Sequence, residues 1–277
     1  MRNTILGLVL ALGFISCNNS TSETRSYKLE EGITKKGNFE MINTSNNPPH
    51  FTRSELYIQF DLKLNSIENG NHNWELLFRH VKMIQGQPIG QDIYYDSNPS
   101  GENSALSDNI AGTYNALLNI PIALVTNSYG KLISEIDYDT IFGGAAFVVK
   151  NNSNLTQVLK YLFNPIPSYP IADGDSWDST YIIKYSAPVQ MTDNYEFVDA
   201  DNKYGLVIET DIEMAEHPDQ YDNVKNIFGT QQAVVSLSSK TNFVSSMSLK
   251  QALTMQLEQN GKPKSVGFNT TMNLKLN

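Results

Sequence analysis

The sequence predicts a mainly β protein with two short helices, an α+β fold built on a long-stranded antiparallel sheet that curls into a half-barrel. Two observations support this prediction. Apolar and polar residues alternate over long segments, of which residues 55–65 are the clearest, and a period of two buries one face of a strand. Asn-Gly pairs at residues 69–70 and 260–261 separate neighbouring segments, and Asn-Gly is typical of tight hairpin turns.

The composition limits the class of protein. Hydrophobic residues make up 40% and aromatic residues 10% of the 277 positions, which is enough for a packed core. The formal net charge is −9, so we expect repulsion from phosphate backbones and no nucleic-acid partner. The chain contains one cysteine, which excludes an intramolecular disulfide.

Residues 1–16 have the pattern of a signal peptide. Arg2 supplies a positive charge, residues 5–15 form a short apolar run, and Ser16 is the small residue directly before Cys17. The pattern predicts cleavage before Cys17 and attachment of acyl chains such as palmitate to that residue, which gives stable membrane attachment. The alternative is an ordinary secretory signal with an incidental cysteine. No later apolar run is long enough to span a bilayer.

Residues 17–27 are predicted to be the lipidated cysteine and a flexible tether, because positions 18–25 are polar. Asn18 stands where enteric-type signals for the inner membrane carry aspartate. We therefore expect an outer-membrane lipoprotein of the cell envelope whose folded body faces the periplasm. The lipid anchor is its expected contact with the membrane.

The first β-rich part, residues 28–168, opens with the clearest strand pair. Residues 55–65 alternate strictly, and Trp74 to Ile84 form the partner strand. In the partner, the apolar residues change face halfway along. Either a β-bulge near Arg79–His80 or burial of both faces explains the change.

The second β-rich part, residues 169–277, repeats this pattern. Alternating segments occupy Leu206–Met214, Met247–Leu257 and Val266–Leu276. These strands are about ten residues long, above the usual mean. The two parts are expected to form one continuous domain.

Two segments depart from the strand pattern. Residues 104–118 and 154–163 carry apolar residues at helical spacing. Hairpins are predicted at residues 122–136 and again at 233–249, after a pair of long strands in each case. They indicate either an internal duplication or the chance recurrence of hairpins in a large β protein.

The sharpest local motif is Asp173-Gly174-Asp175-Ser176-Trp177-Asp178. A lipase of the GDS type would carry its nucleophile after a buried strand in an α/β fold, and this context is missing. Asp173, Asp175 and Asp178 are weak candidates for calcium ligands, because the spacing lacks a full loop pattern. A turn that begins a strand explains the motif best. We therefore predict no metal site and no cofactor.

The histidines are His50, His72, His80 and His217. None has metal-helix spacing, and no nucleophile elbow occurs. His80 is predicted to share a strand face with Trp74 and to be half-buried in a structural role. We predict no catalytic residue and a protein that is not an enzyme.

The chain resembles an uncharacterised family of lipoproteins common in Bacteroidetes-type bacteria. The resemblance rests on Cys17, on Tyr94-Tyr95-Asp96-Ser97, on Tyr129-Gly130-Lys131 and on residues 166–177, which end in Gly-Asp-Ser-Trp. It implies no activity or catalytic residue. In architecture, a curled sheet with helices against one face is also similar to the half-barrels of periplasmic lipoprotein carriers.

These observations favour a non-enzymatic envelope lipoprotein that binds a hydrophobic ligand or a protein partner in the concavity of its sheet. The alternatives are a scaffold subunit of an envelope complex and a hydrolase with an unrecognised site. The residues expected on the ligand-binding face are Leu56, Ile58, Phe60, Leu62, Ile208, Ile212, Met255 and Phe268.

Overall fold

The computed structural model describes most of the chain from residue 22 onward. The described residues are 22–47, 50–87, 89–98, 100, 103–105, 107–134, 141, 159, 162–163, 166–184, 187–200, 203–215, 223–259 and 261–277. The predicted signal peptide and Cys17 lie outside the described residues. Within the described part of the chain, no helix has the length and apolar character needed to cross a bilayer.

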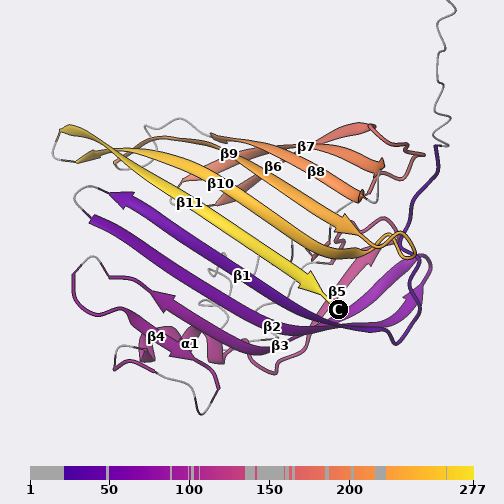
Figure 1. Ribbon diagram of the computed structural model, residues 1–277, viewed down its shortest axis with the longest axis horizontal. Helices are drawn as coiled ribbons and strands as arrows, with labels where there is room; N and C mark the ends of the chain where they lie inside the picture. Colours follow the sequence, from indigo (N-terminus) through magenta and orange to yellow (C-terminus); the bar gives the residue numbers. More distant parts are fainter. Residues whose placement is uncertain are drawn as a thin grey trace, which may run out of the picture.

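One large antiparallel sheet dominates the structure (Figure 1). Its strands are β1 (Thr34–Asn47), β2 (His50–Glu68), β3 (Asn71–Gln85), β4 (Ile93–Asp96), β5 (Ile122–Asn127), β6 (Ser176–Lys184), β7 (Pro188–Ala200), β8 (Lys203–Met214), β9 (Val224–Leu237), β10 (Val244–Gln259) and β11 (Lys262–Leu276). The predicted long strands are confirmed, since several exceed ten residues.

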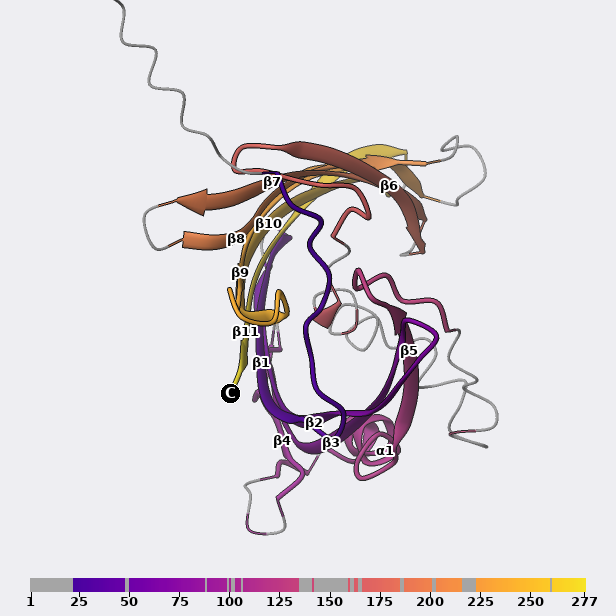
Figure 2. The same cartoon turned by 90° about the vertical axis from the view of Figure 1, so that its right-hand side faces the viewer.

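The strand order is β4-β3-β2-β1-β11-β10-β9-β8-β7-β6, with β5 also paired to β3. Among the described residues, the two edges do not pair, so the sheet is open. Figure 2 shows that it arches strongly, with β5 forming the wall opposite β11. The predicted curled antiparallel sheet is therefore confirmed at this level.

The two β-rich parts of the chain meet in the middle of the sheet. Strand β1 pairs with β11 over ten positions, from Gly37 opposite Leu276 to Asn46 opposite Gly267. The first part then extends to one edge of the sheet, and the second part to the other. Both predicted parts therefore contribute strands to one continuous sheet.

Helix α1 (Asp108–Asn115) lies within the predicted helical segment 104–118. The predicted helix at 154–163 falls mostly outside the described residues. The late hairpin forms as a regular ladder between β9 and β10. In the early hairpin, the described residues show one isolated bridge, between Thr126 and Leu132.

A β-bulge confirms one of the two explanations for the phase change in β3. Gln59 pairs with His80 and Phe60 pairs with Phe78, so Arg79 is the extra residue. The bulge turns His80 to the face opposite Trp74. The predicted shared face of these two residues is therefore wrong, because an extra residue reverses the alternation.

The N-terminal segment 22–33, here called the strap, crosses one end of the arch (Figure 2). Its backbone bonds to Ile171 through Glu23, to Ser128 through Tyr27 and to Thr241 through Lys28. Its Tyr27 is buried in the core, 6% exposed. Within the predicted flexible tether 17–27, the chain is thus bonded to the fold from residue 23 onward and is buried at Tyr27, because the strap satisfies backbone groups of three separate segments.

Candidate functional site

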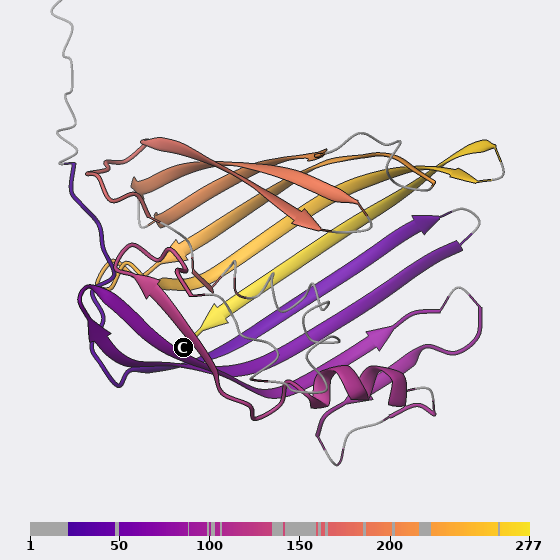
Figure 3. The same ribbon diagram turned by 180° about the vertical axis from the view of Figure 1, so that it is seen from behind.

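The inner face of the arch carries almost all of the buried apolar side chains. Residues directly opposite each other in a β ladder point to the same face, so the register assigns every side chain to one side. Figure 3 views the molecule from behind, where β5 and α1 lie in front of the inner face. Near the strap, this face is a filled core around Trp74, Phe60 and Phe243, each at most 2% exposed.

A row of polar side chains crosses the middle of this apolar face. We call it the polar belt. From β3 to β6, its nine members are paired one to the next in the sheet register, with one on each strand: Gln85, Ser54, Asn43, Thr270, Gln251, Gln231, Thr210, Asp193 and Ser179.

The inner row next to the belt, on the side of the strap, is apolar or aromatic on every strand. Its members are Met83, Leu56, Met41, Met272, Leu249, Ala233, Ile208, Tyr195 and Trp177. The belt is therefore a sharp boundary rather than a gradual change in polarity.

Hydrogen bonds link the belt residues across the strands. Thr210 Oγ1 donates to Asp193 Oδ1 at 2.7 Å, and Gln231 Nε2 donates to Thr210 Oγ1 at 3.2 Å. Gln251 Nε2 donates to Gln231 Oε1 at 3.4 Å. A second link joins Thr270 Oγ1 to Asn43 Oδ1 at 2.7 Å. Polar groups on an apolar face need such partners, since an unpaired buried group is costly.

Asp193 anchors one end of this chain and is completely buried. Besides Thr210, its carboxylate accepts bonds from Tyr181 OH at 3.2 Å and Tyr195 OH at 3.1 Å. Burial, followed by the negative charge of Asp193, raises the pKa of Tyr195 above its ordinary value. Three hydroxyl donors therefore solvate the carboxylate.

Beyond the belt, away from the strap, the inner face becomes apolar again on β6 to β11. We call this second apolar surface the distal patch. Its members are Tyr181, Ile183, Ala187, Val189, Met191, Ile212, Met214, Val224, Ile227, Leu253, Met255 and Leu257, with Val266 and Phe268 alongside on β11.

The distal patch is less covered than the core near the strap. Leu253, Met255, Leu257 and Phe268 are only partly buried. Large apolar side chains that stay partly exposed on a concave sheet are typical of ligand-binding surfaces.

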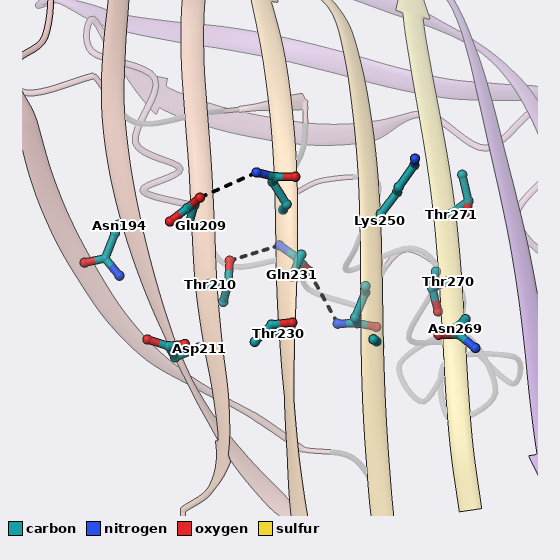
Figure 4. Close-up of a pocket in the computed structure, with 13 residues that line it drawn as sticks. Asn194, Glu209, Thr210, Asp211, Thr230, Gln231, Lys250, Asn269, Thr270 and Thr271 are labelled. Carbon is teal, nitrogen blue, oxygen red and sulfur yellow. Dashed lines mark hydrogen bonds between the residues drawn. The ribbon is translucent and has the colours of Figure 1, made fainter.

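The outer face is hollowed directly behind the belt. A groove of about 580 Å³ there is lined by outer-face residues of β7 to β11 and by the belt residues Thr210, Gln231, Gln251 and Thr270 between them. Its walls are polar outer-face side chains, among them Glu209 and Lys250. Figure 4 shows this groove together with the belt hydrogen bonds from Gln251 to Gln231 and from Gln231 to Thr210.

The eight residues predicted for the ligand-binding face all lie on the inner face, but in two environments. Leu56, Ile58, Phe60, Leu62 and Ile208 belong to the filled core near the strap. Ile212, Met255 and Phe268 lie in the distal patch. The structure thus separates three candidates that border a partly exposed surface from five that pack the core.

The three aspartates near the Gly-Asp-Ser-Trp motif do not converge. Asp173 Oδ1 accepts the Asp199 amide at 2.7 Å, and Asp175 Oδ2 accepts the Ala172 amide at 2.8 Å. Asp178 is exposed on strand β6. Among the described residues, no group of three or more His, Cys, Asp or Glu is arranged to hold a metal ion.

His72 and His80 have different surroundings. His80 Nε2 lies 2.6 Å from Asp96 Oδ1 on the outer face and is half-buried. Burial raises the pKa of Asp96, but bonds from the Asn98 amide and from His80 outweigh that effect and lower it. Where the chain is described, no hydroxyl bonds to His80. The side chain of His50 and all of His217 lie outside the described residues.

Sequence reasoning missed the polar belt. On strands β8, β9 and β10, one polar residue interrupts an otherwise apolar inner series, as Thr210 does between Ile208 and Ile212. That signal is present in the sequence, but a single such residue carries no information about its neighbours on other strands. Only the register shows that these residues form one row.

Comparison with solved structures shows the architecture. The chain matches a lipovitellin structure described as "Lipid-protein interactions in lipovitellin" with a TM-score of 0.54 and 10% identity. The match covers 90% of this chain and 25% of the lipovitellin chain, so the chain spans a quarter of that protein's length. This level of identity shows a shared fold alone.

A second structure, the MucA/MucB complex of Pseudomonas aeruginosa, matches with 8% identity over 84% of this chain and 88% of the other. Its TM-score of 0.14 is too low to indicate a common fold. No curated protein matches the sequence. A family model matches residues 69–244, which is more than half of the chain, and the protein therefore belongs to DUF6263, a family of unknown function.

Proposed function

We propose that this protein binds a hydrophobic ligand, such as a lipid acyl chain, on the distal patch of its inner face. One observation supports this most strongly. Leu253, Leu257 and Phe268 remain partly exposed on the concave side of a sheet whose other half is filled. Their burial by a ligand would be favourable by about 25 cal/mol for each Å² of apolar surface removed from water.

The likeness to the lipovitellin sheet supports the same proposal. That structure is described by its lipid–protein interactions, and a curled open sheet offers one broad apolar face to such a ligand. Five of the eight sequence-predicted residues pack the filled core, so the ligand surface centres on Ile212, Met255 and Phe268 with their neighbours. The role is that of a carrier or receptor in the cell envelope, with the membrane reached through the anchor predicted at Cys17.

A matched pair of substitutions tests the proposal. Leu253→Asp places a charge in the distal patch, whereas Ala252→Asp places it on the exposed outer face of the same strand. Binding of the uncharged fluorophore Nile red is measured by titration, and lipids extracted from the purified protein are identified by mass spectrometry. We expect Leu253→Asp to weaken binding at least about tenfold, because a buried charge is costly. Ala252→Asp should bind like the unmodified protein.

Two results would contradict the proposal. One is a protein that contains no extractable lipid and shows no saturable binding of Nile red. The other is equal binding by the two aspartate variants when thermal unfolding shows that both are folded, because the ligand would then not lie on the distal patch.

A further inference from the structure

The polar belt indicates which kind of hydrophobic ligand the distal patch accepts. We propose that the ligand is an amphiphile with an uncharged hydrogen-bonding head group, such as a monoacylglycerol, whose head lies on the belt and whose chain lies on the distal patch. This inference rests on the proposed function and specifies its ligand class.

The position of the belt is the first step in the argument. On strands β8, β10 and β11, the belt residues are Thr210, Gln251 and Thr270. The neighbouring inner-face residue on the distal side of each is apolar: Ile212, Leu253 and Phe268, respectively. An amphiphile that lies along the strands would thus contact polar and apolar side chains in the order of its own head and tail. No other polar row of the inner face spans these strands in the described part of the chain.

The exposure of the belt is the second step. Asp193, Thr210 and Gln231 are at most 4% exposed, whereas Gln251 and Asn43 are only half-buried. Gln85, Ser54 and Ser179, towards the edges of the row, are also half-buried, and Thr270 is 9% exposed. In the middle of the row, a ligand can therefore reach the amides of Gln251 on β10 and Asn43 on β1, which lie on either side of Thr270 on β11. Amides and hydroxyls both donate and accept, so they match the hydroxyl or ester groups of a neutral head.

The charge of the belt is the third step. Its one ionisable side chain is Asp193, and no lysine or arginine is among its nine members. An anionic head group, such as a carboxylate or a phosphate, would be desolvated on the belt without a cation to pair with. The Asp193 carboxylate already receives three hydroxyl donors and is fully buried, so it does not select for a cationic head. A neutral head is the class that remains.

The test compares two ligands with the same chain, 1-monopalmitoylglycerol and palmitate, as competitors of Nile red at a pH at which palmitate is ionised. We expect the purified protein to prefer the monoacylglycerol by about tenfold, as one to two neutral hydrogen bonds would produce. The double substitution Gln251→Leu with Thr270→Val should reduce this preference to about twofold or less, while the affinity for Nile red stays within about twofold.

The control is the double substitution Lys250→Leu with Thr271→Val. It changes the residues adjacent to Gln251 and Thr270 in the chain, whose side chains point to the outer face. It should keep the full preference. If the inner double variant fails to fold, Thr270→Val alone carries the test, because valine keeps the shape of threonine.

The outcomes separate the two proposals. Equal or tighter binding of palmitate by the unmodified protein overturns the head-group assignment and leaves hydrophobic binding intact. Retention of the monoacylglycerol preference in the folded inner variant overturns the role of the belt. A protein that does not bind Nile red contradicts the proposed function, and the head-group assignment fails with it.

Discussion

At the scale of single residues, the structure shows which polar side chains the fold tolerates in its core and how. Asp193 is completely buried but receives three hydroxyl donors. His72 is 2% exposed, and its Nδ1 atom has no hydrogen-bond partner among the described residues. The two cases have different consequences. The hydroxyl donors compensate the Asp193 carboxylate for its lost hydration, whereas burial of the His72 imidazole disfavours its protonated, charged form.

His72 leads to a prediction about pH. Its ring lies in the aromatic core between Tyr27 of the strap and Trp74, with Thr126 opposite it on β5. Burial lowers the pKa of His72 below its ordinary value of 6.5, although a backbone bond to Asn127 partly opposes this. The unfolded chain therefore takes up the proton first as the pH falls. The stability that the neutral histidine contributes is present above pH 6.5 and is lost below it.

The measurement is thermal unfolding of the unmodified protein and of His72→Phe between neutral and mildly acidic pH. The substitution keeps an aromatic ring of similar size, so it should change the free energy of unfolding at neutral pH by less than about 1.5 kcal/mol. We expect the unmodified protein to lose more stability on acidification than the variant. Parallel losses in the two proteins would show that His72 does not contribute.

At the scale of structural elements, the strap connects parts of the sheet that lie far apart in sequence. Arg25 is central to this element. Its guanidinium donates to Tyr204 OH at 2.8 Å, pairs with Asp199 at 3.0 Å, and lies 4.6 Å from the centre of the Phe197 ring. Asn242 adds a bond from its Nδ2 to the Ser26 carbonyl at 2.7 Å. The strap therefore closes the filled end of the arch and leaves the distal patch at the other end.

Arg25→Met is predicted to loosen the strap. Methionine keeps the length of the side chain but removes its bonds to Tyr204 and Asp199, and bonds of a charged donor contribute about 1.5–3 kcal/mol each. We expect a loss of roughly 2 kcal/mol in the free energy of unfolding and faster amide hydrogen exchange in residues 22–29. Denaturant unfolding and mass-spectrometric exchange measure these effects.

Arg79→Met is the matched control for the strap, because Arg79 pairs with Asp61 at 2.7 Å but is half-exposed on the outer face. A pair of this kind contributes about 0–1 kcal/mol. Unchanged exchange protection of the strap in Arg25→Met would contradict the proposed closure.

At the scale of the whole molecule, the strap also changes the expected distance from the membrane. Residue 23 is bonded to Ile171, so about five residues separate the fixed chain from Cys17 instead of the ten of the predicted tether. If Cys17 carries the lipid, we expect the filled end of the arch, where the strap lies, to be the end nearer the membrane. The distal patch would then lie at the end farther from it.

Cys17→Ser tests the anchor directly. We expect the unmodified protein to incorporate a labelled palmitate analogue and to sediment with membranes, because several acyl chains give stable attachment. The serine variant should lose the label and the sedimentation. Cleavage without acylation, with the unmodified protein found free of membranes, would favour the alternative of an ordinary secretory signal.

The sequence by itself determined the strands and which face of each strand is apolar. Alternation in residues 55–65 placed Leu56, Ile58 and Phe60 on one buried face, and the reversal of the pattern in β3 located the bulge that the structure places at Arg79. These features are local, because the period of two and the turn residues act within one strand or one hairpin.

The tertiary structure alone decided three features: the polar belt, the division of the inner face into a filled core and the distal patch, and the bonding of the strap to the rest of the fold. Asn43 and Thr270 are paired although 227 positions separate them in the chain, and no local pattern specifies such a pairing. The distinction between Phe60 in the filled core and Phe268 in the partly exposed patch likewise depends on what covers each residue. The register between distant strands and the burial of each inner-face residue both arise from long-range packing. The fold could therefore be predicted from the sequence, but the candidate site could not.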